Sequence, residues 1–342
     1  MPSLSSVQEK DRARGALYGL AIGDALGMPT QMLSRQQITR RWGPLLTGFE
    51  AAPPGHPIAA GMPAGAVTDD TEQAVLLARL LLSSSASRVD PRELAAALAA
   101  WERGMAARGS LDLLGPSTRR AIDAVLAGTP PEEAGASGDT NGAAMRIAPV
   151  GIMVAAGNLT ALADAVQEAS LVTHNTSVAL AGAAAVAAAV SACVSGAGTP
   201  ETAEVAIAAA RLGAERGHWV AGADVGTRIQ WAGALVAGLP AEQAAEVIYS
   251  LVGTSLATQE SVPAAFAVLS AVPDDPWRAC LLAASLGGDC DTIAAMTGAI
   301  AGACHGLAAF PARAVEVIDA HGFALADLAD ALLARRRTAG HA

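Results

Sequence analysis

Two stretches of the sequence place paired aspartates and a hydroxyl side chain directly before a long apolar run. In the stretch 286–292, a Gly-Gly pair precedes Asp289, Asp291 and Thr292, and an apolar segment typical of a buried helix follows at 293–304. Glycines let the backbone turn tightly and approach a ligand closely. Two buried carboxylates repel each other unless a cation neutralises them. The stretch therefore predicts a cation site, against the simpler interpretation that Asp289 and Asp291 only cap a helix and face water.

The second stretch has a similar composition. Residues 67–71 contain Thr68, Asp69, Asp70 and Thr71, and an apolar helix is predicted to follow at 74–82. Together the two stretches offer four carboxylates and three hydroxyl groups, enough oxygen for two neighbouring metal ions with water completing the coordination. Ligand sets made only of oxygen favour Mg²⁺, Mn²⁺ or Ca²⁺ over Zn²⁺. We expect the two stretches to build one shared site.

The overall composition is that of a well-buried globular protein and excludes several functional classes. Of the 342 residues, 52% are hydrophobic and 16% are charged, and nothing in this composition suggests disorder. The net charge of −10 leaves no basic surface on which a nucleic acid could bind. An acidic protein that handles an anionic substrate would need metal ions to offset its charge, which agrees with the two acidic stretches.

Three further features indicate a cytoplasmic protein that is not bound to a membrane. The cysteines are Cys193, Cys280, Cys290 and Cys304. They form no CxxC pair and are predicted to be free buried thiols. Residues 1–11 are polar and lack the apolar core of a signal peptide. The segment 178–194 is apolar but short and rich in alanine, so we expect a core helix there and not a membrane span.

The hydrophobic pattern predicts an all-α fold. Alanine and leucine dominate, and alternating runs of β-branched residues are nearly absent. The predicted helices are 10–27, 74–82, 90–108, 115–126, 178–194, 201–216, 225–236, 241–251, 261–272, 276–286 and 293–304. Candidate site residues near positions 24, 70, 141, 174 and 290 must converge, so we predict a single domain over residues 1–342.

The first helix and the loop that follows it contain polar residues that could belong to the site. Asp24 lies on the apolar face of the predicted helix 10–27, together with Leu17 and Leu20. It could cap a neighbouring helix or take part in the site. The segment 40–66 is rich in proline and glycine and contains His56, and loops of that length often cover a functional site.

A small polar loop and a histidine are further candidates for ligand binding. The loop 137–142 reads SGDTNG, and its glycines and amide could hold phosphate or ribose oxygens through N–H groups. A plain turn between helices would have the same composition. His174, at a predicted helix junction, could cap a helix, contact a ligand or stack on a base, and the structural role is the simpler interpretation.

Five ordered groups of these residues resemble the ADP-ribosylglycohydrolase family, which includes the dinitrogenase-reductase-activating glycohydrolase and the ADP-ribosyl-acceptor hydrolases. They are GALYG and GDALG within 15–27, TDDT at 68–71, NGAAMR at 141–146, Thr-His at 173–174 and GGDCDT at 287–292. They occur in the family order and span residues 13–308. The resemblance is closest to a bacterial branch with LGPS at 114–117 and ESVP at 260–263.

The resemblance implies an orthogonal bundle of helices with a binuclear magnesium or manganese site that hydrolyses an N- or O-glycosidic bond at C1 of a ribose. By the family pattern, the metal ligands are Thr68, Asp69, Asp70, Asp289, Asp291 and Thr292. The residues that resemble the substrate site are Gly138, Asp139, Thr140, Asn141, Gly142 and His174. The implied partner is an ADP-ribosyl or nucleoside-type small molecule, which could also be attached to a modified protein.

One position departs from the family pattern. Many members have a glutamate seven residues after the aspartate of the first motif, which contacts a metal and assists catalysis, whereas this sequence has Gln31. A glutamine can offer its carbonyl oxygen to a metal but cannot accept a proton near neutral pH. Either Asp69, Asp70 or Asp289 acts as the base, with Gln31 beside it as a further catalytic candidate, or this branch has another mechanism, or it has lost activity. Two alternatives stay open: hydrolysis of a smaller nucleoside or ribosyl metabolite, and non-catalytic binding of ADP-ribose or a nucleotide.

Overall fold

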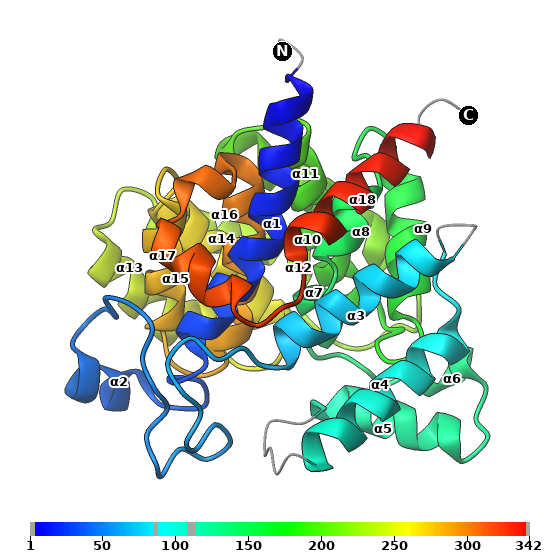
Figure 1. Ribbon diagram of the computed structural model, residues 1–342, viewed down its shortest axis with the longest axis horizontal. Helices are drawn as coiled ribbons and strands as arrows, with labels where there is room; N and C mark the ends of the chain where they lie inside the picture. Colours follow the sequence, from blue (N-terminus) through cyan, green and yellow to red (C-terminus); the bar gives the residue numbers. More distant parts are fainter. Residues whose placement is uncertain (1–3, 85–87, 108–113, 340–342) are drawn as a thin grey trace.

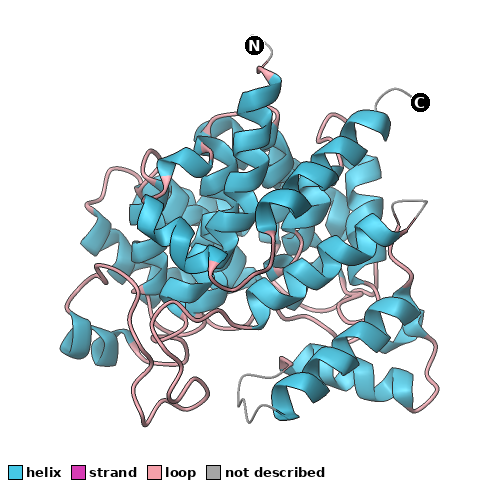
Figure 2. Cartoon of the chain, viewed as in Figure 1, coloured by secondary structure: helices cyan, strands magenta, loops and turns pink. Residues whose placement is uncertain are grey.

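Helices account for the regular secondary structure in the part of the chain that the structure describes. The computed structural model describes residues 4–84, 88–107 and 114–339. Figure 2 shows helices joined by loops, and within these ranges no strand is formed. Extended pairing is limited there to the isolated bridges Thr140–Ala257 and Thr176–His218. The predicted all-α class is confirmed.

The helices follow one another along the chain as labelled in Figure 1. They are α1 (Ser6–Gly27), α2 (Arg35–Trp42), α3 (Asp69–Ser83), α4 (Pro91–Ala107), α5 (Pro116–Leu126), α6 (Pro131–Ala134), α7 (Gly142–Met145), α8 (Ala148–Met153), α9 (Leu159–Ser170), α10 (Ser177–Val194), α11 (Thr199–Ala214), α12 (Val225–Val236), α13 (Ala241–Val247), α14 (Thr258–Ala271), α15 (Pro276–Ala284), α16 (Cys290–His305), α17 (Ala312–Asp319) and α18 (Leu325–Ala339). A π-helix, η1 (Ile248–Val252), and a 3₁₀ turn, η2 (Leu307–Ala309), complete the order.

Helices α1 and α16 pack side by side in the middle of the molecule and meet through glycines (Figure 1). A Cβ atom added to Gly298 would lie 1.9 Å from the carbonyl oxygen of Gly19, and one added to Gly302 would lie 2.0 Å from that of Gly15. We call these four residues the glycine seam. Because the seam has no room for a side chain, the two backbones touch along it.

Helix α10 forms the other half of the core. Every residue from Ser177 to Val194 is buried. In the described residues it is the one helix long and apolar enough to cross a membrane, and the protein covers all of that span. The prediction of a core helix at 178–194 is thereby confirmed. The buried apolar side chains of α1, α10 and α16 belong to one continuous cluster, which supports the proposed single domain.

The prediction of four free thiols is wrong for two of the cysteines. Cys193 on α10 and Cys304 on α16 form a disulfide, with their Cα atoms 4.5 Å apart. These residues are separated by 111 positions in the sequence, and only the packing of α10 against α16 brings them together. Cys280 and Cys290 are free and buried, as predicted.

The predicted helix boundaries hold well where the sequence contains a clear cap. Helix α12 spans 225–236, as predicted, and begins after Asp224, whose side chain accepts a hydrogen bond from the N–H group of Thr227 at 2.6 Å. The predicted loop 40–66 begins inside α2, which Ser34 caps. The predicted helix 241–251 changes from α13 into the π-helix η1.

Candidate active site

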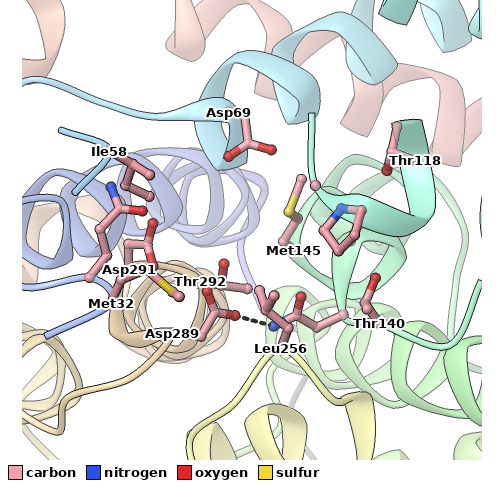
Figure 3. Close-up of a pocket in the computed structure, with 15 residues that line it drawn as sticks. Met32, Ile58, Asp69, Thr118, Thr140, Met145, Leu256, Asp289, Asp291 and Thr292 are labelled. Atoms are coloured by element: carbon pink, nitrogen blue, oxygen red, sulfur yellow. Dashed lines mark hydrogen bonds between the residues drawn. The ribbon is translucent and has the colours of Figure 1, made fainter. Parts of the chain in front are cut away.

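A pocket of about 220 Å³ opens where several loops and helix beginnings meet (Figure 3). Its lining residues are Gln31, Met32, Ile58, Asp69, Gly115, Pro116, Thr118, Thr140, Asn141, Gly142, Met145, Leu256, Asp289, Asp291 and Thr292. We call Asp69, Asp289, Asp291 and Thr292 the carboxylate wall. We call Pro116, Thr118, Thr140, Gly142 and Met145 the loop wall. In Figure 3, Thr118 and Thr140 lie on the other side of the pocket from Asp289 and Asp291.

The carboxylate wall joins the two acidic stretches of the sequence. Asp69 is the first residue of α3, while Asp291 and Thr292 lie in the first turn of α16. The Thr292 hydroxyl donates a hydrogen bond to Asp70 Oδ2 at 3.2 Å, across 222 positions of sequence. Asp69 contributes to the pocket surface, whereas Asp70 is completely buried behind it. The two acidic stretches therefore meet at one pocket, as expected.

Asp24 caps the beginning of α3. Its carboxylate accepts hydrogen bonds from the backbone N–H groups of Thr68 and Thr71, at 3.0 and 3.1 Å, and from both threonine hydroxyl groups. A carboxylate at a helix N-terminus satisfies backbone donors that have no partner within the helix. Of the two roles that the sequence left open for Asp24, the structure gives it the cap. The same contacts place Thr68 behind the pocket surface, so its predicted role as a metal ligand stays a prediction.

Burial raises the pKa values of two carboxylates of the site, and mutual repulsion adds to this effect at Asp70. Burial, together with the charges of Asp291, Asp24 and other nearby aspartates, raises the pKa of Asp70 well above its usual value. Burial raises the pKa of Asp289 to about 6, although hydrogen bonds from Asn141 and Thr292 act in the opposite direction. Burying several carboxylates together is costly unless a cation offsets their charge. The site therefore has the electrostatics of a cation-binding site.

Gln31 lies in the turn between α1 and α2 and lines the pocket. Its side chain is buried, and its Nε2 atom has no hydrogen-bond partner among the described residues. The turn is attached to the Gly-Gly pair, because the Met32 N–H group donates to the Gly288 carbonyl at 2.7 Å and the Gly288 N–H group donates to Leu33 at 2.9 Å. Gly288 has a positive φ of 73°, which glycine adopts without strain.

The loop 137–142 contributes only its second half to the pocket. Thr140, Asn141 and Gly142 line it. Gly138 packs against the backbone of the segment before α10, and Asp139 is exposed. Asn141 donates a hydrogen bond from Nδ2 to Asp289 Oδ2, shown as a dashed line in Figure 3, and another to Ser261 at 3.1 Å. The amide that the sequence singled out thus holds a carboxylate of the opposite wall.

The structure places His174 one layer behind the pocket. Its side chain is completely buried and does not line the cavity, so it has no direct access to a ligand there. Its Nε2 atom lies 3.0 Å from the hydroxyl oxygen of Thr140, which does line the cavity. Burial and the charges of Arg146 and Arg120 lower the pKa of His174 well below its usual value, so the imidazole is neutral near pH 7.

Comparison with known proteins identifies the family. The model of the ADP-ribosylglycohydrolase family matches residues 5–342. The chain belongs to the ADP-ribosylglycohydrolase family. The resemblance that the motifs indicated is confirmed.

Relatives of this family cover most of the chain. The chain is 34% identical to YegU of Escherichia coli (strain K12), with 90% of this chain and 92% of that protein aligned. It is 30% identical to ADP-ribosylarginine hydrolase Tri1 of Pseudomonas putida (strain GB-1), with 92% and 76% aligned. A solved structure of an ADP-ribosylglycohydrolase-related protein complex superposes with a TM-score of 0.69 and 26% identity, covering 96% of this chain and 99% of that one.

The donor atoms of this ADP-ribosylglycohydrolase pocket fit a hard divalent cation. Asp70 Oδ1 is buried and has no hydrogen-bond partner among the described residues. Carboxylate, hydroxyl and amide oxygens are the ligands that Mg²⁺ and Mn²⁺ prefer. Within the described ranges, no three His, Cys, Asp or Glu side chains converge on a single point as ligands of one ion. Hydroxyl groups, Gln31 or water would therefore have to complete the coordination.

Sequence reasoning missed the apolar part of this ADP-ribosylglycohydrolase pocket. Met32, Ile58, Met145 and Leu256 line it, and they come from separate loops and from the short helix α7. Isolated apolar residues of this kind give no periodic signal. One clue was available for Ile58, since it lies in the long segment 40–66 that was expected to cover a site.

Proposed function

We propose that this protein is a metal-dependent hydrolase that cleaves a ribosyl glycosidic bond, and that its substrate is an ADP-ribosyl adduct. The family is one of ADP-ribosyl hydrolases, and the similar protein Tri1 of Pseudomonas putida is an ADP-ribosylarginine hydrolase. The observation that carries the proposal is the meeting of both acidic stretches at one pocket, where buried carboxylates have raised pKa values. A helix cap that faced water would not need this arrangement.

The proposed reaction breaks the bond between C1 of the ribose and its leaving group. Positive charge develops at C1 in an oxocarbenium-like transition state, which the negative carboxylate wall would stabilise. When bound, Mg²⁺ or Mn²⁺ would offset the remaining carboxylate charge and orient the ribose hydroxyls. Asp69, the least buried aspartate of the wall, would accept the proton of the attacking water, and the leaving group would depart with the bonding electrons.

Two amide side chains have supporting roles in this proposal. Asn141 holds Asp289 by a hydrogen bond and so limits the directions in which that carboxylate can point. Gln31 lines the pocket and cannot accept a proton, but its carbonyl oxygen is able to accept a hydrogen bond from a substrate hydroxyl or to contact a metal ion. The proton acceptor must then be one of the aspartates.

The size of the pocket favours a second candidate substrate. Ligand pockets for drug-sized molecules typically measure about 300–1,000 Å³, and this one measures about 220 Å³. A free nucleoside or a small ribosyl metabolite would fill such a volume more completely than ADP-ribose, whose second half would extend out of the pocket.

We also propose a cytoplasmic location and no nucleic-acid partner.

Turnover of defined substrates tests the proposal. ADP-ribosyl-arginine, ADP-ribosyl-serine and simple nucleosides would each be incubated with the protein in Mg²⁺, in Mn²⁺ and in a chelator. We expect release of the leaving group with at least one substrate, and no release in the chelator. Binding of ADP-ribose without any turnover would identify a non-catalytic binder, and turnover that is unchanged in the chelator would refute the metal dependence.

A further inference from the structure

The buried side chains behind the pocket form a continuous chain of hydrogen bonds that begins at Arg146. This guanidinium is 1% exposed and donates from one nitrogen to Gln73 Oε1 at 2.9 Å and from another to Thr173 Oγ1 at 2.5 Å. Gln73 in turn donates from Nε2 to Asp69 Oδ2 at 2.8 Å. One buried arginine is thus connected to the carboxylate wall on one side and to Thr173 on the other.

The direction of the hydrogen bonds on the Thr173 side follows from what each group can donate. An arginine only donates, so Thr173 Oγ1 accepts from Arg146 and has one hydrogen left to give. Two acceptors lie within reach: His174 Nδ1 at 2.8 Å and the Ser170 carbonyl oxygen at 3.4 Å. The Ser170 carbonyl already accepts from the N–H groups of Thr173 and His174, at 3.0 and 2.8 Å. The hydroxyl hydrogen of Thr173 therefore belongs to His174 Nδ1.

This direction assigns the tautomer of His174. A neutral imidazole carries one hydrogen, and with Nδ1 acting as the acceptor that hydrogen must be on Nε2. Nε2 then donates to the hydroxyl oxygen of Thr140 at 3.0 Å. Since Thr140 accepts from His174, the hydrogen of its own hydroxyl group can point into the pocket that Thr140 lines.

We propose that Arg146, acting through Thr173 and His174, makes Thr140 a hydrogen-bond donor to an oxygen atom of the substrate. Arg146, Thr173 and His174 are positioning residues, and only Thr140 touches the ligand. The inference rests on the proposed function, because the acceptor is a ribosyl or phosphate oxygen of the substrate.

The assigned direction has a consequence for specificity. With the opposite tautomer, the Thr140 hydroxyl would donate to His174 and would offer only lone pairs to the pocket. The pocket would then select a ligand with a hydrogen-bond donor next to Thr140. A hydroxyl group that is committed as a donor selects an acceptor instead, and a ligand that lacks the acceptor leaves a polar group unpaired. Arg146 thus makes the pocket prefer a ligand with a hydrogen-bond acceptor near Thr140, although Arg146 does not itself line the pocket.

The tautomer can be measured in the protein without a ligand. The chain has six histidines, and nuclear magnetic resonance of protein labelled with ¹⁵N in histidine would show the protonated and the unprotonated ring nitrogen of each. Loss of one set of signals in His174→Gln would assign those of His174. We expect hydrogen on Nε2 and a bare Nδ1 in the parent and in Thr173→Ser, and a loss of this single tautomer in Thr173→Val. A protonated Nδ1 in the parent would overturn the inference.

Binding measurements test the role of Thr140. Calorimetric titration with ADP-ribose and with adenosine, both in Mg²⁺, would compare Thr140→Val with Thr140→Ser. We expect Thr140→Val to weaken ADP-ribose binding by about tenfold and Thr140→Ser to bind nearly as the parent does, since serine keeps the hydroxyl. An equal loss for adenosine would place the acceptor on the ribose of adenosine, and a loss for ADP-ribose alone would place it on a phosphate or on the second ribose.

Two results would count against the donor role of Thr140. One is unchanged binding of both probes by Thr140→Val, and the other is a loss in Thr140→Ser as large as that in Thr140→Val. A parent that binds neither probe would refute the proposed function and the donor role together. The tautomer of His174, which is measured without a ligand, would still be decided separately.

Discussion

On one side of the pocket, Asp291 and Thr292 lie on a helix that meets its neighbour backbone to backbone; on the other side, Thr140 is held by an isolated backbone bridge to Ala257 and by a side-chain hydrogen bond. Asp291 and Thr292 begin α16, which packs on α1 through the glycine seam. Thr140 is held by the hydrogen bond to His174 at 3.0 Å and follows the four-residue helix α6. Asp291 and Thr292 thus rest on close main-chain packing of two helices, whereas the hydroxyl of Thr140 depends on a side-chain contact that a single substitution can change.

The strongest test of this difference is the removal of a carboxylate. Asp69→Ala and Asp291→Asn should each weaken Mg²⁺ or Mn²⁺ binding and lower kcat by about 10²–10⁴-fold, the usual contribution of a catalytic acid or base. Calorimetry would measure metal binding, and the substrate panel would measure turnover. Asp123→Asn, at an exposed position of α5, serves as the control. If both variants bound metal as the parent does, the aspartates would be helix caps only.

The next effect concerns the glycine seam. Gly298→Ala should lower the free energy of unfolding by about 3 kcal/mol, because its Cβ atom would lie 1.9 Å from the Gly19 carbonyl oxygen and the helices would have to separate. Gly157→Ala, where a Cβ atom would meet nothing within 4 Å, should change stability by less than about 0.5 kcal/mol. Denaturant unfolding would measure both. Equal losses in the two variants would show that the close contact of α1 and α16 does not depend on the glycines of the seam.

A smaller effect is expected at Gln31, beside the carboxylate wall. Gln31→Ala should lower activity by about tenfold, as expected for the loss of a hydrogen bond to the substrate and not of the base. Gln31→Glu should keep similar activity or change its pH dependence. Side-by-side turnover of the parent and both variants is the measurement. A silent parent together with an active Gln31→Glu would show that Gln31 disables the enzyme.

The smallest effect is the pH dependence that His174, behind the loop wall, gives to the free energy of unfolding. His174 has a pKa well below its usual value, so as the pH falls below about 6.5 the unfolded chain takes up a proton that the folded protein does not. Its contribution to stability is present above that pH and is lost as the pH falls. Between pH 6 and pH 5, the parent should lose up to about 1.4 kcal/mol more per pH unit than His174→Gln does. If the free energies of unfolding of the parent and of His174→Gln changed equally with pH, His174 would not be buried and neutral.

Local composition made the carboxylates and the helices predictable. Paired aspartates beside hydroxyl residues at the start of an apolar run indicate a cation site without any knowledge of the fold, and alanine-rich segments indicate core helices. The order of the motifs along the chain also indicated the ADP-ribosylglycohydrolase family. Asp69, Asp289, Asp291 and Thr292 could therefore be selected from the sequence, and all four line one pocket.

Features that depend on which helices become neighbours could not be predicted in this way. Asp24 becomes a cap only because α3 begins beside it. Cys193 and Cys304 pair only because α10 packs on α16. The sequence indicated His174 as a candidate, but its place behind Thr140 depends on how the loop 137–142 folds against the segment before α10.

The spacing of the glycines in α1 and α16 also limits how the two helices can move. Gly15, Gly19 and Gly23 recur every four residues in α1, and Gly298 and Gly302 do so in α16. A slide of one helix along the other would drive larger residues into the opposing backbone, and the next register that aligns glycines again is four residues away, about 6 Å. A step of that size would separate the aspartates of α16 from Asp69 altogether. The glycine seam consequently opposes sliding of α16, and with it of Asp291 and Thr292, along α1.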